Sequence, residues 1–122
     1  MSQHSNLEGV LPLTESTLLI LLSLAESPKH GYAIMKAAAS LSEGRVHLST
    51  GTLYGAIKRL LARGWIERAE RDDTIDPDGQ AAGRPRTPYA LTDLGRRVLR
   101  AEVARLQALV SIADLCGAGA RP

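Results

Sequence analysis

The 122-residue sequence contains no phenylalanine, and aromatic residues make up only 3% of it. Apolar residues as a whole make up 44% and charged residues 23%, which is the composition of a chain that folds. The core must therefore consist mostly of Leu, Ile, Val and Ala. The length leaves room for one domain around one modest core and gives no reason to expect a second domain.

Cysteine is represented by Cys116 alone. One cysteine excludes an internal disulfide framework and any metal cluster built on cysteine. The three histidines, His4, His30 and His47, lack the spacing of metal ligands. We therefore expect no metal site and no cofactor. The single cysteine also fits the reducing cytoplasm, where we expect the protein to act.

A long apolar run is missing as well. The apolar stretch at residues 17–25 is far shorter than the roughly 20 residues that a membrane-spanning helix needs. The N-terminus lacks the basic region, apolar core and cleavage site of an export signal. The sequence also offers no paired carboxylates, no nucleophile with a base and no phosphate-binding loop. We expect neither a membrane segment nor an export signal, and we expect that the protein is not an enzyme.

Charge is segregated along the chain, although the net charge is only +2. Residues 29–71 hold eight Lys or Arg against three Glu, whereas residues 72–83 hold four Asp and no basic residue. Residues 1–28 are acidic, and residues 84–122 are again basic. A basic middle segment is typical of a protein that binds a polyanion such as nucleic acid.

Capping and stop residues predict three helices in the first half of the chain. A Ser or Thr side chain can accept a hydrogen bond from an unpaired amide in the first turn, and Gly is favoured at a left-handed end. The predicted helices run from the cap Thr14 to about Ala25, from Gly31 to Leu41, and from the cap Ser49 to Arg63, with Gly64 as the stop. The alternating stretch at residues 45–48 predicts one brief strand before the third helix.

A hairpin is expected to follow the third helix. Residues 65–71 and 87–91 are its predicted strands, and residues 72–86 between them are rich in Asp-Pro, Pro-Asp-Gly and Gly-Arg-Pro turn sequences. In one plausible register Trp65 and Tyr89 face each other, with packing in the core as their expected role. Two strands joined by a long loop make a wing.

A long helix capped by Thr92 and ended by Gly117 is expected to close the fold, reaching to about Leu115. Apolar residues recur along it at intervals of four, three, four and three, which is a heptad pattern that favours pairing with a second helix. This dimer seam consists of Leu99, Val103, Leu106, Val110 and Ala113. Leu94 and Val98 are better placed to close the helix onto its own domain.

The predicted fold class is therefore mainly α with a small β-hairpin, as a winged helix-turn-helix with a long C-terminal dimerisation helix. The expected segments are an N-terminal arm at 1–13, the winged helix-turn-helix at 14–91 with its wing at 65–91, the dimerisation helix at 92–116 and a tail at 117–122. In this fold the third helix usually enters the major groove of DNA. Because fold alone does not establish function, the surface of that helix has to be considered.

The outward face of the third helix combines small and basic residues. Gly51, Gly55, Lys58 and Ala62 lie opposite the apolar stripe, with Tyr54 and Arg59 on its flanks. Each glycine inside a helix costs about 1 kcal/mol relative to alanine, so two on one exposed face call for a reason. Close approach of a DNA backbone or base edge is one reason. The alternative is a tolerated pair, with Gly51 merely easing the start of the helix.

The residues predicted to contact DNA come from three places: the start of the second helix, the third helix, and the wing. They can position the protein by binding phosphates through cations, hydroxyls or helix amides. These residues are Lys29, His30, Tyr32, Ser49, Thr50, Gly51, Thr52, Tyr54, Gly55, Lys58, Arg59, Arg84 and Arg86. Two alternatives stay open: His30 can bond locally, and Arg86 can pair with Asp residues of its own loop.

Several motifs in order resemble the PadR family of bacterial transcriptional regulators. They are His30-Gly31-Tyr32, the run from Leu48 to Tyr54, Lys58-Arg59-Leu60, Gly64-Trp65-Ile66, the run Gly83 to Arg86 and the run Tyr89 to Gly95. The resemblance spans about residues 14–100. It implies a winged-helix homodimer of the short subfamily that binds double-stranded DNA, usually as a repressor of a nearby operon.

The resemblance also implies a small-molecule effector, since some members of the family bind phenolic acids or hydrophobic drugs. The drug-binding members use aromatic residues near the dimer interface, and the last helix here has none. The acidic residues of the wing are a second departure, and we expect residues 72–79 to point away from phosphates. A winged-helix module that binds another protein instead of DNA is the alternative function.

Overall fold

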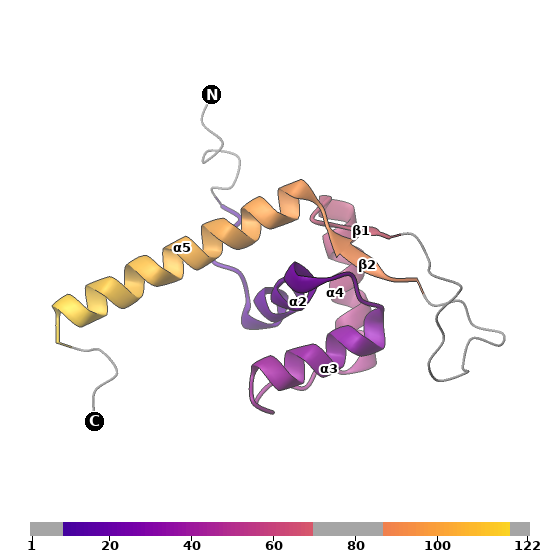
Figure 1. Cartoon of the computed structure of the whole chain (residues 1–122), viewed down its shortest axis with the longest axis horizontal. Helices are drawn as coiled ribbons and strands as arrows, with labels where there is room; N and C mark the ends of the chain where they lie inside the picture. Colours follow the sequence, from indigo (N-terminus) through magenta and orange to yellow (C-terminus); the bar gives the residue numbers. More distant parts are fainter. Residues whose placement is uncertain (1–8, 70–86, 118–122) are drawn as a thin grey trace.

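The computed structural model describes residues 9–69 and 87–117. Within these ranges the chain forms four helices and a two-stranded sheet (Figure 1). In chain order they are α2 (Glu15–Glu26), α3 (Gly31–Leu41), α4 (Thr50–Arg63), β1 (Ile66–Arg68), β2 (Tyr89–Leu91) and α5 (Asp93–Leu115). The predicted class, mainly α with a small β-hairpin, is confirmed.

The helix starts depend on side-chain caps. The hydroxyl oxygen of Thr14 accepts from the amide of Thr17 at 3.2 Å, and that of Ser49 accepts from the amide of Thr52 at 3.1 Å. Thr92 caps α5 in the same way, with the amide of Gly95 at 2.9 Å. These three caps are the ones that the sequence predicts, because capping is a local interaction.

The centre of the core is α2, which contacts α3, β2 and α5. Its residues Ile20, Leu21 and Leu24 are at most 1% exposed. As expected from its nearly continuous apolar sequence, the helix is covered on several sides.

The start of α5 lies directly on the start of the hairpin. A β-carbon at Gly95 would sit 1.9 Å from the carbonyl oxygen of Trp65, so only glycine fits at this crossing. The amide of Thr92 donates to the same carbonyl at 3.0 Å. After this crossing α5 continues as one long helix, which packs against the core up to about Val103 and then extends past it (Figure 1).

The register of the sheet differs from the one expected. Ile66 pairs with Leu91 and Arg68 pairs with Tyr89, so Trp65 and Tyr89 do not face each other. Both aromatic side chains are nevertheless buried, as expected for a role in packing. The free edge of β2 bonds to the backbone of Lys29, whose amide donates to the carbonyl of Tyr89 at 3.0 Å.

The strand expected at residues 45–48 is absent, so this prediction was wrong. The side chain of Ser42 satisfies the backbone there, because its hydroxyl oxygen accepts from the amide of Val46 at 2.9 Å. The extended backbone that pairs with the hairpin comes instead from Lys29, between α2 and α3.

Residues 9–13 were expected to be part of a loose arm, but they pack against the core of the domain and against α5. Val10, Leu11 and Leu13 pack against the core. The amide of Leu13 donates to a carboxylate oxygen of Glu102 at 3.0 Å, and Glu102 is 1% exposed. Arg105 donates two hydrogen bonds to the same carboxylate, at 2.6 and 3.0 Å. The segment before α2 is therefore held against the middle of α5 by a hydrogen bond to a buried carboxylate.

The wing is described only at its base, because residues 70–86 lie outside the described ranges. The predicted orientation of residues 72–79 therefore stays a prediction. None of the helices in residues 9–69 and 87–117 is long and apolar enough to cross a membrane.

Candidate nucleic-acid interface

The outer face of α4 is open to solvent. Leu53, Ala56, Ile57 and Leu60 turn inward and are at most 3% exposed. The predicted DNA contacts on this helix are exposed or, in the case of Gly55, partly exposed; they are Thr50, Gly51, Thr52, Tyr54, Gly55, Lys58 and Arg59. The structure therefore brings these predicted contacts together on one helix, on the side away from the core.

Packing inside the chain does not require the two glycines of this face. A β-carbon at Gly51 would meet nothing within 4 Å, and one at Gly55 would meet only a guanidinium nitrogen of Arg59, at 3.8 Å. Both glycines thus carry a cost of up to about 1 kcal/mol in helix stability without a packing reason. Because neither glycine has a side chain, the backbone of α4 is accessible to a partner at these two positions.

Tyr54 joins the outer face of α4 to the start of α3. A β-carbon at Gly31 would lie 2.2 Å from the hydroxyl oxygen of Tyr54, so the tyrosine ring rests on the glycine. Tyr54 is still 46% exposed. The glycine of the His30-Gly31-Tyr32 motif therefore makes room for a residue of the candidate interface.

The start of α3 adds a second exposed aromatic residue. Tyr32 is 61% exposed, and the ammonium nitrogen of Lys36 lies 5.5 Å from the centre of its ring. A cation over a ring at this distance is attracted by the negative face of the ring. Sequence reasoning missed Lys36, although its position one helical turn after Tyr32 was a usable signal.

Lys29 was predicted to contact DNA, and the structure gives it another role. Its ammonium group donates to the carbonyl of Ser23 at 2.7 Å and to the hydroxyl of Ser27 at 3.2 Å, and it lies 3.9 Å from a carboxylate oxygen of Glu26. Only 18% of the side chain is exposed. Lys29 therefore binds the C-terminal end of α2, and its contact with DNA stays a prediction.

Hydroxyl groups at the start of α4 are partly used by the cap. Ser49 donates to the hydroxyl oxygen of Thr52 at 2.9 Å while it accepts from the Thr52 amide. The Thr52 proton can still be donated to a phosphate, as can that of exposed Thr50. His30 occupies the cap position of α3 without a capping hydrogen bond from its side chain.

The predicted wing contacts Arg84 and Arg86 lie outside the described residues. Within those residues, the hairpin base carries exposed Arg68 on β1.

The predicted dimer seam divides into a buried and an exposed part. Leu99 is 7% exposed and packs in the core of its own chain, which leaves little of it for the predicted dimer interface. Val103 also packs partly against that core, together with Leu94, and Val98 is fully buried. From Leu106 onward the helix leaves the domain, and Val110 is 60% exposed. Ala113 is half-buried.

Three further apolar residues lie exposed on this free part of α5. Leu109 is 49%, Ile112 is 54% and Leu115 is 88% exposed. Sequence reasoning left them out because they fall beside the strict heptad positions. Together with Leu106, Val110 and Ala113 they form the apolar end of α5, a surface that is largely exposed within the described residues.

Known proteins share the sequence pattern and the fold of this chain. Residues 20–101, more than half of the chain, match the Transcriptional regulator PadR-like family. Among solved structures, a PadR family transcription regulator of Clostridium difficile superimposes with a TM-score of 0.65, at 22% identity over 84% of this chain and 97% of that one. A PadR-like transcriptional regulator of Bacillus cereus gives a TM-score of 0.64, at 19% identity over 94% and 98% of the two chains.

Among curated proteins, an uncharacterized 37.1 kDa protein in transposon TN4556 of Streptomyces fradiae is 38% identical over 88 residues. The match covers 72% of this chain but only 22% of that protein. The solved structures share the fold, and the family match covers the helices and the hairpin that build the candidate interface. The chain therefore belongs to the Transcriptional regulator PadR-like family, and its helices and hairpin have the winged helix-turn-helix fold of the solved family structures.

Proposed function

We propose that the protein is a homodimeric repressor that binds a palindromic operator. In this arrangement, α4 of each subunit enters one of two successive major grooves, about 34 Å apart. The observation that carries the proposal is the outer face of α4, which is exposed and carries the cations Lys58 and Arg59.

Contacts to the phosphates follow from the groups on this face. Lys58 and Arg59 are exposed cations on α4, and each can neutralise a phosphate. Tyr54, Thr50 and Thr52 add hydroxyl donors, which fix the position of the helix without selecting a sequence. Arg84 and Arg86 of the wing remain predicted contacts to the adjacent minor groove or backbone.

Pairing of two subunits through the apolar end of α5 is the reason for proposing a palindromic operator. A second helix that covers the apolar end of α5 would bury its exposed side chains, and hydrophobic burial is the main driving force for such pairing. A two-fold symmetric dimer presents two copies of α4, and its operator then has two inverted half-sites. Release of the operator by a hydrophobic or phenolic effector stays a prediction.

Selection of DNA from a random pool by the purified protein tests this proposal. We expect enrichment of duplexes with two inverted half-sites, and binding to them at least about a thousand times tighter than to random duplex at moderate salt. The matched control is the selected duplex with half a helical turn inserted between its half-sites, which should bind much more weakly. Equal affinity for selected and random duplexes would refute the proposal.

A protein-interaction module is the second candidate, and the apolar end of α5 is the observation that favours it. A different chain could cover that surface in place of a second copy. This alternative predicts no salt-dependent affinity for DNA and a hetero-complex in size-exclusion chromatography. A homodimer that binds DNA in a salt-dependent manner would exclude it.

A further inference from the structure

Glu102 is a buried acidic residue on an otherwise apolar stripe of α5. Gly95, Val98, Leu99 and Glu102 recur at helical spacing on the side of α5 that faces the domain, and all four are buried. An apolar side chain at the last position would be buried without the cost of removing a carboxylate from water. Burial alone therefore does not explain an acid at this position.

The carboxylate of Glu102 has hydrogen-bond partners on both oxygens. Arg105 donates to the two oxygens, at 2.6 and 3.0 Å, and the amide of Leu13 donates to one of them at 3.0 Å. Hydrogen bonds are directional, whereas apolar contacts are not, so this group fixes the position of the Leu13 backbone relative to α5. The bond lies where the segment before α2 crosses the middle of α5 in Figure 1.

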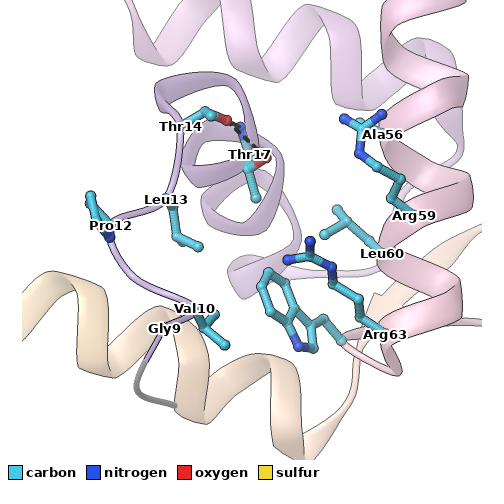
Figure 2. Close-up of a pocket in the computed structure, with 11 residues that line it drawn as sticks. Gly9, Val10, Pro12, Leu13, Thr14, Thr17, Ala56, Arg59, Leu60 and Arg63 are labelled. Atoms are coloured by element: carbon cyan, nitrogen blue, oxygen red, sulfur yellow. Dashed lines mark hydrogen bonds between the residues drawn. The ribbon is translucent and has the colours of Figure 1, made fainter.

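The segment before α2 is also attached to the rest of the domain. Val10, Leu11 and Leu13 pack against the core. Figure 2 shows Val10 and Leu13 turned toward α4 across a pocket of about 270 Å³, which Arg59 and Arg63 also line. Because this pocket separates the segment from α4, the segment is held by its contacts with the core and with α5.

Two points along α5 therefore fix the direction of the helix. Gly95 lies directly against the carbonyl of Trp65, and two turns later Glu102 is bound to the segment before α2. At about 1.5 Å of rise per residue, the helix extends about 20 Å from Glu102 to Leu115. A tilt of about 10° over this length displaces the far end by about 3 Å, close to the rise of one base pair, about 3.4 Å.

We propose that Glu102 is a positioning residue for DNA binding: its bond to Leu13 fixes the direction of α5, and thereby the distance between the two copies of α4 in the dimer. The inference rests on the proposed homodimer, in which the apolar ends of α5 pair. In that dimer α5 connects each copy of α4 to the paired ends, so its direction sets the span of the two recognition helices. A dimer with a fixed span binds best to half-sites at one spacing.

Operators with altered spacing test the proposal. The selected duplex is compared with duplexes that have one base pair inserted or removed between the half-sites, and with a duplex that holds a single half-site. We expect the wild-type protein to bind the selected spacing at least about tenfold tighter than the altered spacings. Glu102→Gln should reduce this ratio at least about threefold, whereas its affinity for the single half-site should equal that of the wild type.

A second variant loosens the segment without altering a buried charge. The double substitution Val10→Ser and Leu11→Ser weakens the contacts of the segment with the core, and it should lower the spacing ratio in the same direction. Ile34→Val, in the core on α3, is the control for lost stability. It should keep the wild-type ratio, because unfolding lowers the affinity for every duplex alike. An unchanged ratio in the folded segment variants, or an equal loss of affinity for all duplexes including the single half-site, would overturn the proposal.

A distance measurement on the free protein separates this proposal from the proposed repressor function. Cys116 is exposed and is the only cysteine, so Cys116→Ser combined with Ser40→Cys at an exposed position of α3 gives one spin label per subunit. The distance between the two labels should have a narrow distribution without further substitution and a broader or shifted one with Glu102→Gln. Identical distributions would overturn the proposal even if the dimer binds its operator. A monomer without specific DNA binding would refute the repressor function as well.

Discussion

At the scale of single residues, different physical factors explain the glycines that lie within the helices. Gly95 faces the backbone of Trp65 and Gly31 faces the ring of Tyr54, so packing explains both of them. Gly51 faces open space, and a β-carbon at Gly55 would make only an ordinary contact with Arg59, at 3.8 Å. This contrast separates glycines that packing explains from glycines that packing does not explain.

Substitution of Gly55 tests this distinction. Gly55→Ala meets no obstruction in the chain, so it should raise the free energy of unfolding by about 0.5–1 kcal/mol through its better helix propensity. The added methyl group should nevertheless weaken operator binding several-fold, since it lies on the outer face of α4. Urea denaturation and DNA titration measure the two effects. A more stable protein with unchanged affinity for DNA would show that the glycine is merely tolerated.

Glu102 gives a prediction on pH. The hydrogen bonds from Arg105 act together with the one from the Leu13 amide and hold the pKa of this carboxyl below its ordinary value, against the effect of burial. A lowered pKa in the folded state means that the carboxylate stabilises the fold above the ordinary pKa of glutamate, and that this contribution is lost as pH falls through the lowered pKa.

The comparison of wild type with Glu102→Gln measures that contribution. We expect the variant to be less stable by about 2 kcal/mol at neutral pH, because a charge-assisted network becomes a neutral one, and the difference should shrink at acidic pH. Glu15→Gln is the control, since its ion pair with Arg45 is exposed and should matter less. A stability difference that does not depend on pH would contradict the assigned role.

At the scale of elements, α5 serves two purposes along its length. Its first half is part of the core through Val98 and Leu99, and Glu102 fastens the N-terminal segment to it. Its second half is an apolar surface with no covering inside the described chain. The change occurs near Leu106, so substitutions beyond that residue can alter assembly without altering the fold.

Val110→Glu tests the role of the second half. A carboxylate placed on the apolar end of α5 would be buried without a partner in a dimer, so we expect the dissociation constant of the dimer to rise at least about 100-fold. Analytical ultracentrifugation measures this constant, and Gln107→Glu, at an exposed polar position of the same helix, is the control. If Val110→Glu stays as dimeric as the control, the subunits do not pair through this surface.

At the scale of the whole molecule, the sequence predicted what depends on neighbouring residues. The caps at Thr14, Ser49 and Thr92 each involve an amide three residues away, and the helix boundaries followed from them. The exposed face of α4 was predictable for the same reason, since helical periodicity alone decides which side chains share a face.

Contacts between distant segments could not be predicted in this way. The bond from Leu13 to Glu102 joins residues 89 positions apart, and the pairing of Lys29 with Tyr89 likewise needs the folded chain. The contacts that Lys29 and Leu99 make inside their own chain were not predicted, because their types and positions suit an interface as well as they suit a core. The pocket beside Arg59 and Arg63 had no signal in the sequence, because its two walls come from separate segments.

The most direct test of the central claim, that the outer face of α4 binds the DNA backbone, is the salt dependence of operator affinity. For wild type, the logarithm of the binding constant should fall linearly with the logarithm of salt concentration, and Lys58→Ala should reduce this slope by about one unit and weaken binding to all duplexes alike. Arg100→Ala on α5 should leave the slope unchanged. A slope that is the same in wild type and Lys58→Ala would contradict the account.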